Sequence, residues 1–152
     1  MPDKPIISDT SCFIILSNIG ELELLHKVYG QVATTMEVAA EFGQDLPSWI
    51  EIKAARDKHL QQVLEMQIDK GKASAIALAI ETQGSTLILD DYKARKIATS
   101  LGLSITGTLG VIIKAKLQKV IPTIKPIIDK MKKTNFRLAV EIEKQALKEA
   151  GE

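Results

Sequence analysis

Acidic side chains follow two apolar runs of this sequence, each at a point where a strand is expected to end. Asp9 comes directly after the run 5–8, and the pair Asp90 and Asp91 follows a second such run. Between them, Glu41 closes a short segment with helical spacing of its apolar residues. Carboxylates gathered at the end of an apolar sheet repel one another and lose hydration. A divalent cation with oxygen ligands is the usual compensation, so the pattern predicts a hard-metal site and favours a metal-dependent enzyme.

These acids must be positioned by strands and helices that alternate along the chain, an order typical of an α/β fold with a parallel sheet. Strands are expected at residues 5–8, 32–34, 49–54, 86–89 and 103–106, and the period-two alternation of 49–54 indicates a half-buried edge strand. Helices are expected at 11–18, 21–28, 36–42, 60–68, 73–81, 92–100 and 109–120, with a break at 69–71. A helical tail is expected from about residue 126, with a weak point at 134–135. Thr35 and Asp69 are expected to cap the helices that follow them.

The composition is that of a soluble globular protein, and the 152 residues predict one domain. No stretch approaches the roughly 20 apolar residues of a membrane span, and the N-terminus lacks a secretory layout, so we expect a cytoplasmic protein without membrane association. The single cysteine, Cys12, excludes an internal disulfide framework. Residues 1–113 carry 10 basic and 14 acidic side chains, and residues 114–152 carry 10 and 5. A basic tail suits a polyanionic substrate, although a solvated lysine face is the simpler interpretation.

Several short motifs in this order and spacing resemble the PIN-domain family, and more narrowly its small prokaryotic branch related to VapC-type toxins. They are Asp9-Thr10-Ser11 after a strand, Glu41 after a short helix, Asp69-Lys70-Gly71-Lys72-Ala73 before a helix, Asp90-Asp91 followed by Ala94-Arg95, and Gly107-Thr108-Leu109-Gly110. The resemblance runs from about Ile6 to Val120. We therefore expect a PIN-like domain at 1–120 and a C-terminal helical extension at 121–152 packed on the same domain.

The resemblance implies a three-layer α/β/α sandwich with a central, mainly parallel sheet and additional C-terminal helices. It also implies hydrolysis of phosphodiester bonds in single-stranded RNA with Mg²⁺ or Mn²⁺ as cofactor, in a ribonuclease that serves as the toxin of a toxin–antitoxin pair. The implied catalytic and metal-binding residues are Asp9, Glu41, Asp90 and Asp91, of which one of the last two would instead cap a helix. Residues implied to contact the substrate or the ligands are Thr10, Ser11, Lys72 and Arg95, the last either on a phosphate or in an ion pair with Asp90 or Asp91.

The implied partners are single-stranded RNA and an antitoxin protein. The apolar segments 111–113 and 127–128 further suggest a homodimer, because such helix faces are often buried between two copies of a chain.

Lys72 departs from the family pattern, which has an acidic residue at this position. Its ammonium could replace part of the metal charge among the carboxylates, or it could turn to solvent. A PIN-fold module that binds RNA or a protein partner without cleavage is therefore the alternative to a ribonuclease. A phosphatase of the haloacid-dehalogenase type is disfavoured because Ser11 stands where its second aspartate is needed. The glycines match neither nucleotide-binding motif, which disfavours an ATPase or a dehydrogenase.

Overall fold

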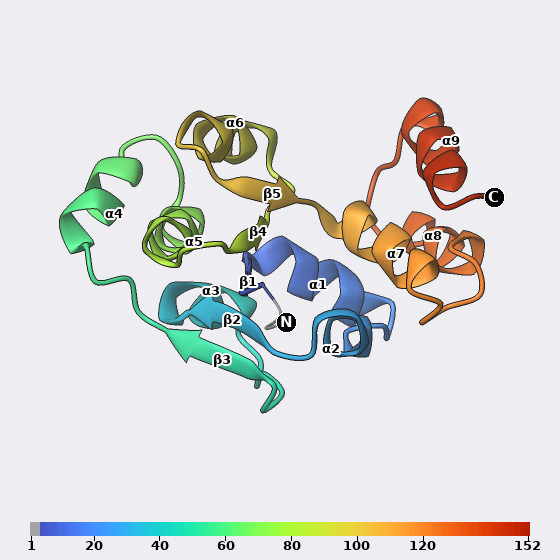
Figure 1. The fold of residues 1–152 in the computed structure, drawn as a ribbon, viewed down its shortest axis with the longest axis horizontal. Helices are drawn as coiled ribbons and strands as arrows, with labels where there is room; N and C mark the ends of the chain where they lie inside the picture. Colours follow the sequence, from blue (N-terminus) through green and yellow to red (C-terminus); the bar gives the residue numbers. More distant parts are fainter. Residues whose placement is uncertain (1–3) are drawn as a thin grey trace.

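The central feature of the fold is a five-stranded parallel sheet in the order β3-β2-β1-β4-β5, seen in a computed structural model that describes residues 4–152 (Figure 1). The strands are β1 (Ile6–Ser8), β2 (Val32–Thr35), β3 (Ile50–Lys53), β4 (Thr86–Ile88) and β5 (Ser104–Thr106). The chain moves from β1 towards one edge of the sheet and from β4 towards the other. The strand order therefore reverses between β1 and β4, which is where parallel α/β sheets form their ligand crevices.

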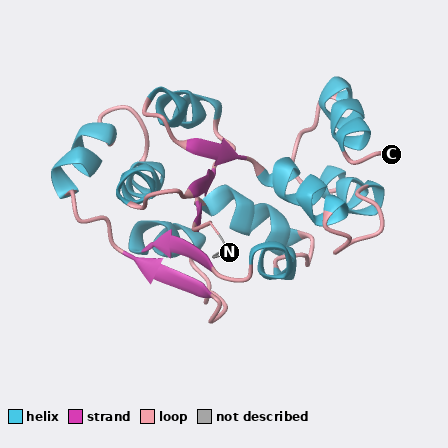
Figure 2. Ribbon diagram, in the orientation of Figure 1, coloured by secondary structure: helices cyan, strands magenta, loops and turns pink. Residues whose placement is uncertain are grey.

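Helices cover both faces of this sheet, which confirms the predicted three-layer α/β/α arrangement (Figures 1 and 2). They are α1 (Thr10–Asn18), α2 (Glu23–Tyr29), α3 (Met36–Phe42), α4 (Lys58–Leu64), α5 (Lys70–Glu81), α6 (Tyr92–Ser100), α7 (Thr108–Leu117), α8 (Lys125–Lys132) and α9 (Val140–Glu149). Helices α4, α5 and α6 lie on one side, and α1, α2 and α7 lie on the other. Helix α3 packs against both α5 and α1. The two last helices lie beyond α7, and α9 packs on it.

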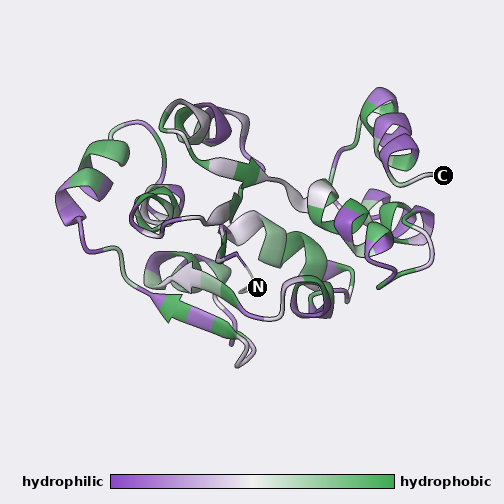
Figure 3. Ribbon diagram, viewed as in Figure 1, coloured by the Kyte–Doolittle hydropathy of each residue, from purple (hydrophilic) through white to green (hydrophobic). Residues whose placement is uncertain are grey.

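The core is densest where α5 crosses the middle of the sheet and contacts β1, β2 and β4. Every residue of α5 from Ala73 to Ala79 is buried, and four of these seven residues are alanines. Small side chains let the helix approach the strands closely, and close packing of this kind resists displacement. The helices differ in how hydrophobic they are. Figure 3 shows that α1 is mostly hydrophobic, whereas α9 alternates hydrophobic and hydrophilic residues. The middle strands and α5 thus form a rigid base for the side chains that follow β1 and β4.

Side chains that cap helices explain why two helices differ from the predicted bounds. Helix α5 begins at Lys70 rather than at residue 73, because Asp69 Oδ1 accepts the backbone N–H of Lys72 at 2.9 Å. The predicted break at 69–71 is therefore wrong, and Gly71 is a buried helical residue. Helix α4 likewise spans Lys58–Leu64 rather than 60–68, since Asp57 Oδ1 caps it through the N–H of Leu60. The predicted cap at Thr35 is confirmed by its bond from the N–H of Val38.

The edge strand β3 is present as predicted, but its predicted half-buried alternation is wrong. Ile50 is buried, whereas Ile52, which lies on the same face of the strand, is 49 % exposed. An edge strand has one neighbouring strand only, here β2, so more of its surface stays open.

The C-terminal tail forms two helices separated by residues 133–139, so the predicted weak point at 134–135 is confirmed. The apolar segments of this region belong to the core of the chain itself, since Val111, Ile112, Ile127 and Ile128 are buried. Ile113, the fifth residue of these segments, is half-buried, so the burial of the other four weakens this argument for a homodimer, which stays a prediction. Among residues 4–152, no helix is long and apolar enough to cross a membrane.

Candidate active site

Asp9 is the most unusual side chain of the described structure, because it is buried without a hydrogen-bond partner. It follows β1 and precedes α1, and its backbone N–H donates to Ile88 O of β4 at 3.0 Å. The residue is 1 % exposed, and neither carboxylate oxygen has a partner among the described residues. It stands at the N-cap position of α1, yet its side chain makes no capping bond. Capping of α1 therefore does not explain the Asp9 side chain.

The surroundings of Asp9 disfavour its charged form. Burial raises the pKa of Asp9 to about 6 and the negative charge of Glu41 acts in the same direction, whereas the backbone N–H of Thr10 and the charge of Lys72 oppose them. A buried carboxylate without partners is unstable unless a cation or a proton neutralises it. Asp9 therefore has the chemistry of a cation ligand.

Glu41, near the end of α3, reaches the same region from the other side of α1. The hydroxyl of Thr10 donates to its two carboxylate oxygens at 3.4 and 3.3 Å. The carboxylate lies against Gly71 so closely that a Cβ atom there would collide with Glu41 Oε1 and lie 2.8 Å from Oε2. Gly71 is thus required for the position of Glu41, a relationship that the sequence analysis missed.

Buried hydroxyls fix the register of α3 against α5, and with it the approach of Glu41 to Gly71. Thr35 Oγ1 lies 2.7 Å from Ser74 Oγ, and Ser74 Oγ donates to Gly71 O at 2.7 Å. All three residues are buried, so breaking this chain of bonds would leave polar groups without partners.

Asp90 follows β4 and, unlike Asp9, is held by several hydrogen bonds. Thr108 donates to it twice, from its N–H to Oδ1 at 2.8 Å and from its hydroxyl to Oδ2 at 2.6 Å. Ser11 Oγ donates to Oδ2 at 3.1 Å. Gly107 leaves room for this arrangement, since a Cβ atom there would lie 2.8 Å from Asp90 Oδ1. Thr108 and Gly107 were also missed, and the only signal for them was the Gly-Thr-Leu-Gly motif of the resemblance.

Asp91 has a different environment from its neighbour. It is exposed, and its Oδ2 accepts the N–H of Ala94 at 2.9 Å, which caps α6. The two adjacent acids therefore divide the two roles that the sequence left open, with Asp90 at the crevice and Asp91 at the helix cap.

The two cations of the predicted site are both held by neighbouring groups. Lys72 Nζ lies 2.7 Å from Asp69 Oδ2. Although partial burial lowers the pKa of Lys72, its hydrogen bond to Asp69 and the charges of Asp9 and Glu41 raise it on balance. The ammonium thus stays charged and acts on both site carboxylates.

Arg95 lies beside the crevice but is not part of an ion pair. Its Nη1 donates to Leu89 O at 3.0 Å. Neither Asp90 nor Asp91 forms an ion pair with it in the described structure, so the predicted ion pair is wrong. Its guanidinium lines the cavity next to Asp90.

The first turn of α1 connects these acids, because consecutive residues point to different carboxylates. Thr10 contacts Glu41, Ser11 contacts Asp90, and Asp9 lies just before them. Within residues 4–152, however, no three His, Cys, Asp or Glu side chains are already arranged around one metal position. The acids are thus connected through consecutive residues of α1 and do not form an assembled ligand set.

A sequence profile of a family described as a PIN domain matches residues 5–152, which is nearly the whole chain and includes α8 and α9. The chain belongs to the PIN-domain family. This family has a nuclease-type fold that generally uses divalent metals, in agreement with acids at the carboxyl end of a parallel sheet. No curated protein and no solved structure matches this PIN domain.

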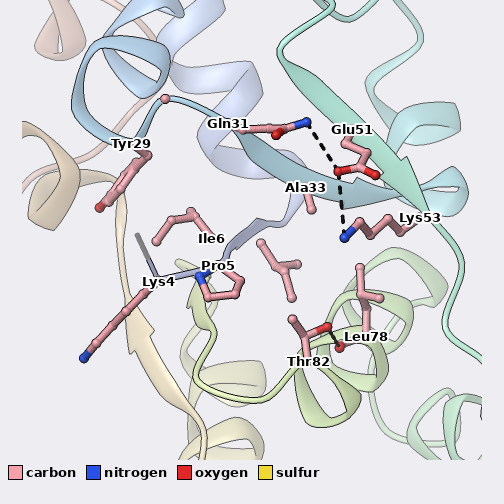
Figure 4. Close-up of a pocket in the computed structure, with 12 residues that line it drawn as sticks. Lys4, Pro5, Ile6, Tyr29, Gln31, Ala33, Glu51, Lys53, Leu78 and Thr82 are labelled. Carbon is pink, nitrogen blue, oxygen red and sulfur yellow. Dashed lines mark hydrogen bonds and ion pairs between the residues drawn. The ribbon is translucent and has the colours of Figure 1, made fainter. Parts of the chain in front are cut away.

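A separate cavity of about 320 Å³ opens near the amino ends of β1 and β2, away from the acids (Figure 4). Glu51 lies there between Gln31 and Lys53, at 3.4 and 3.8 Å. Asp9, Glu41 and Asp90 do not line this cavity, so it is distinct from the candidate active site.

Proposed function

We propose that this PIN domain hydrolyses phosphodiester bonds in single-stranded RNA in a reaction that depends on Mg²⁺ or Mn²⁺. The observation that carries the proposal is Asp9, a buried carboxylate with two unpartnered oxygens at the point where the strand order reverses. Glu41 and Asp90 accept hydrogen bonds from the hydroxyls of Thr10 and Ser11, the two residues that directly follow Asp9.

The donor set fits a hard divalent cation, because it consists of carboxylate oxygens and one of the carboxylates has no hydrogen-bond partner among residues 4–152. Asp9, Glu41 and Asp90 would hold the ion, directly or through water. When bound, such an ion lowers the pKa of a water molecule and neutralises charge on the phosphodiester. Asp91 has no part in this proposal, because its side chain caps α6.

Residues of the chain orient the carboxylates and control the protonation of Asp9. Ser11 and Thr108 fix the orientation of the Asp90 carboxylate through three hydrogen bonds. Thr10 does the same for Glu41, with longer bonds. Asp9 must lose its proton when a cation binds, since burial raises its pKa to about 6. Cation binding is therefore expected to weaken below that pH.

A PIN-fold module that binds RNA or a protein partner without cleavage is the second candidate, and Lys72 is the observation that favours it. Its ammonium acts on Asp9 and Glu41 and already supplies part of the positive charge that they need. In this alternative the lysine replaces the ion, and the carboxylates serve the fold alone.

One experiment separates the two candidates. Thermal unfolding is measured in EDTA, Mg²⁺ and Mn²⁺ for the native chain and for Asp9→Asn, followed by cleavage assays on single-stranded RNA. A metal-dependent rise in midpoint that disappears in the variant, together with metal-dependent cleavage, supports the ribonuclease. An unchanged midpoint and intact RNA support binding without cleavage.

We further propose that the enzyme is cytoplasmic and acts as the toxin of a toxin–antitoxin pair, with an antitoxin protein as partner and a homodimer as its assembly. The basic tail, residues 114–152, supports RNA binding less than its composition suggests. Four of its lysines form ion pairs with acids of the chain: Lys116, Lys125, Lys130 and Lys132. Much of its positive charge is thus already compensated, and RNA contact is better sought beside Asp90.

A further inference from the structure

A cavity of about 350 Å³ lies beside Asp90, between the carboxyl end of β5 and the helices α7 and α9. Asp90 and Arg95 contribute charged groups to it. Its apolar walls come from several elements and include Ile105, Leu109, Ile113, Phe136 and Ile142. Gln145 and Glu149 add polar groups from α9. The cavity shares a carboxylate with the candidate active site, so whatever enters it lies next to the proposed chemistry.

One face of α9 is turned to this cavity, because Ile142, Gln145, Ala146 and Glu149 have the spacing of a single helix face. The helix is attached to the rest of the chain by small residues, with Ala146 and Ala150 buried. Ile142 remains 51 % exposed although it lines the cavity. An open cavity with apolar walls and a few polar groups is the usual form of a site for a small organic group.

Two polar side chains of α9 at this cavity are bonded to each other. Gln145 Nε2 donates to Glu149 Oε1 at 3.1 Å, which orients both side chains and leaves lone pairs on both carboxylate oxygens as acceptors. A carboxylate accepts two parallel N–H bonds well when both donors lie on one edge of a ring. Among the bases of RNA, guanine presents such an edge through N1–H and its exocyclic amine. Unpaired bases are commonly recognised in this way, stacked on an aromatic side chain and bonded along one edge.

We propose that this cavity binds the guanine base adjacent to the phosphodiester that is cleaved, with Phe136 and Ile142 against the ring and Glu149 on its donor edge. The inference rests on the proposed function, because it assigns the cavity to the RNA substrate. Arg95 provides the positive charge that a neighbouring phosphate needs, since its guanidinium lines the same cavity.

Binding is measured without metal, so that the RNA stays intact. Fluorescence anisotropy in EDTA gives the affinity of the full chain for three labelled pentaribonucleotides, which are uridine oligomers with guanosine, adenosine or uridine at the centre. We expect the guanosine oligomer to bind roughly tenfold more tightly, as a good bidentate contact discriminates between bases by that order. In Glu149→Gln the preference should fall below about twofold, since the amide cannot accept both bonds.

A matched pair of variants tests the apolar wall. Ile142→Glu places a charge in the cavity and should weaken binding of the guanosine oligomer about tenfold. Val140→Glu places the same charge on the same helix, two residues away at a position that is 59 % exposed and outside the cavity lining, and should leave binding unchanged. Both sites are on the surface, so folding is preserved, which circular dichroism verifies.

Equal affinity for the three oligomers, no measurable affinity for any of them, or the same effect of the two glutamate variants would overturn the assignment of a base to this cavity. Cleavage of RNA without preference for guanosine would overturn it while leaving the proposed function intact. A guanosine preference in a protein that never cleaves RNA would instead support the cavity and contradict the ribonuclease.

Discussion

Asp69 holds Lys72 twice, once through the backbone N–H at 2.9 Å and once through the ammonium at 2.7 Å. A cation in the first turn of a helix opposes the helix dipole, and the Asp69 carboxylate offsets this unfavourable position. Burial alone would raise the pKa of Asp69, but its hydrogen bonds with Lys72 lower it overall. The result is a fixed positive charge at the start of α5 that competes with any cation for Asp9 and Glu41.

Lys72→Glu should strengthen metal binding, because it removes a competing positive charge and adds a further carboxylate. Without metal, the extra carboxylate adds repulsion and lowers the unfolding midpoint, and in Mn²⁺ the midpoint should rise by more than that of the native chain. Thermal unfolding with and without metal checks both effects. Lys72→Met removes the charge without adding an acid and serves as the control. Identical metal responses of Lys72→Glu and the native chain would show that residue 72 faces away from the site.

The free energy of unfolding should depend on pH because Asp9 is buried. Its pKa is raised to about 6 in the folded chain, so the folded state retains the proton that the unfolded state loses near pH 4. The contribution of Asp9 to stability is therefore full below that pH and is lost as the pH rises through about 6. At pH 7 in EDTA, Asp9→Asn should be more stable than the native chain by about 2–3 kcal/mol, and the difference should vanish near pH 4.

Urea denaturation at several pH values measures this difference between the two chains. A difference that stays constant between pH 4 and pH 7 would contradict the buried environment of Asp9.

The adjacent acids Asp90 and Asp91 should respond differently to the same substitution. Asp91→Asn weakens the cap of α6 and should lower stability by no more than about 1 kcal/mol while cleavage continues. Asp90→Asn disturbs the acceptor of three hydrogen bonds and removes a proposed ligand, so cleavage and the metal-dependent rise in midpoint should be lost. Parallel activity and unfolding measurements on the two variants check this. Loss of metal response in Asp91→Asn alone would reverse the assignment.

Gly71→Ala should displace the Glu41 carboxylate without preventing the chain from folding. The three atoms nearest to the new methyl group all belong to the flexible end of the Glu41 side chain, so the chain should still fold. Alanine also favours a helix over glycine by about 1 kcal/mol. Displacement of the carboxylate should nevertheless reduce metal-dependent cleavage by up to roughly 100-fold. Lys70→Ala, an exposed neighbour in the same turn, is the matched control. Full activity of Gly71→Ala would exclude Glu41 from the site.

Local pattern and cap chemistry were enough to predict most of the fold. The runs at β1 and β4, the caps at Thr35 and Asp69, and the weak point at 134–135 could be read from neighbours along the chain. The predicted break at 69–71 is wrong because Gly71 continues the helix and does not end it. Its actual constraint is the Glu41 side chain, which is 30 positions away in sequence and adjacent in space.

The sequence by itself determined which acids follow the central strands, because a strand places the residue after it at the edge of the sheet whatever its partners are. Only the tertiary structure decided what each acid does there. It left Asp9 without partners, gave Asp90 three donors, and assigned Asp91 to a helix cap. The donors Ser11 and Thr108 reach Asp90 from 79 and 18 positions away. Such contacts depend on how α1 and α7 pack against the sheet, and a local sequence pattern does not predict this packing.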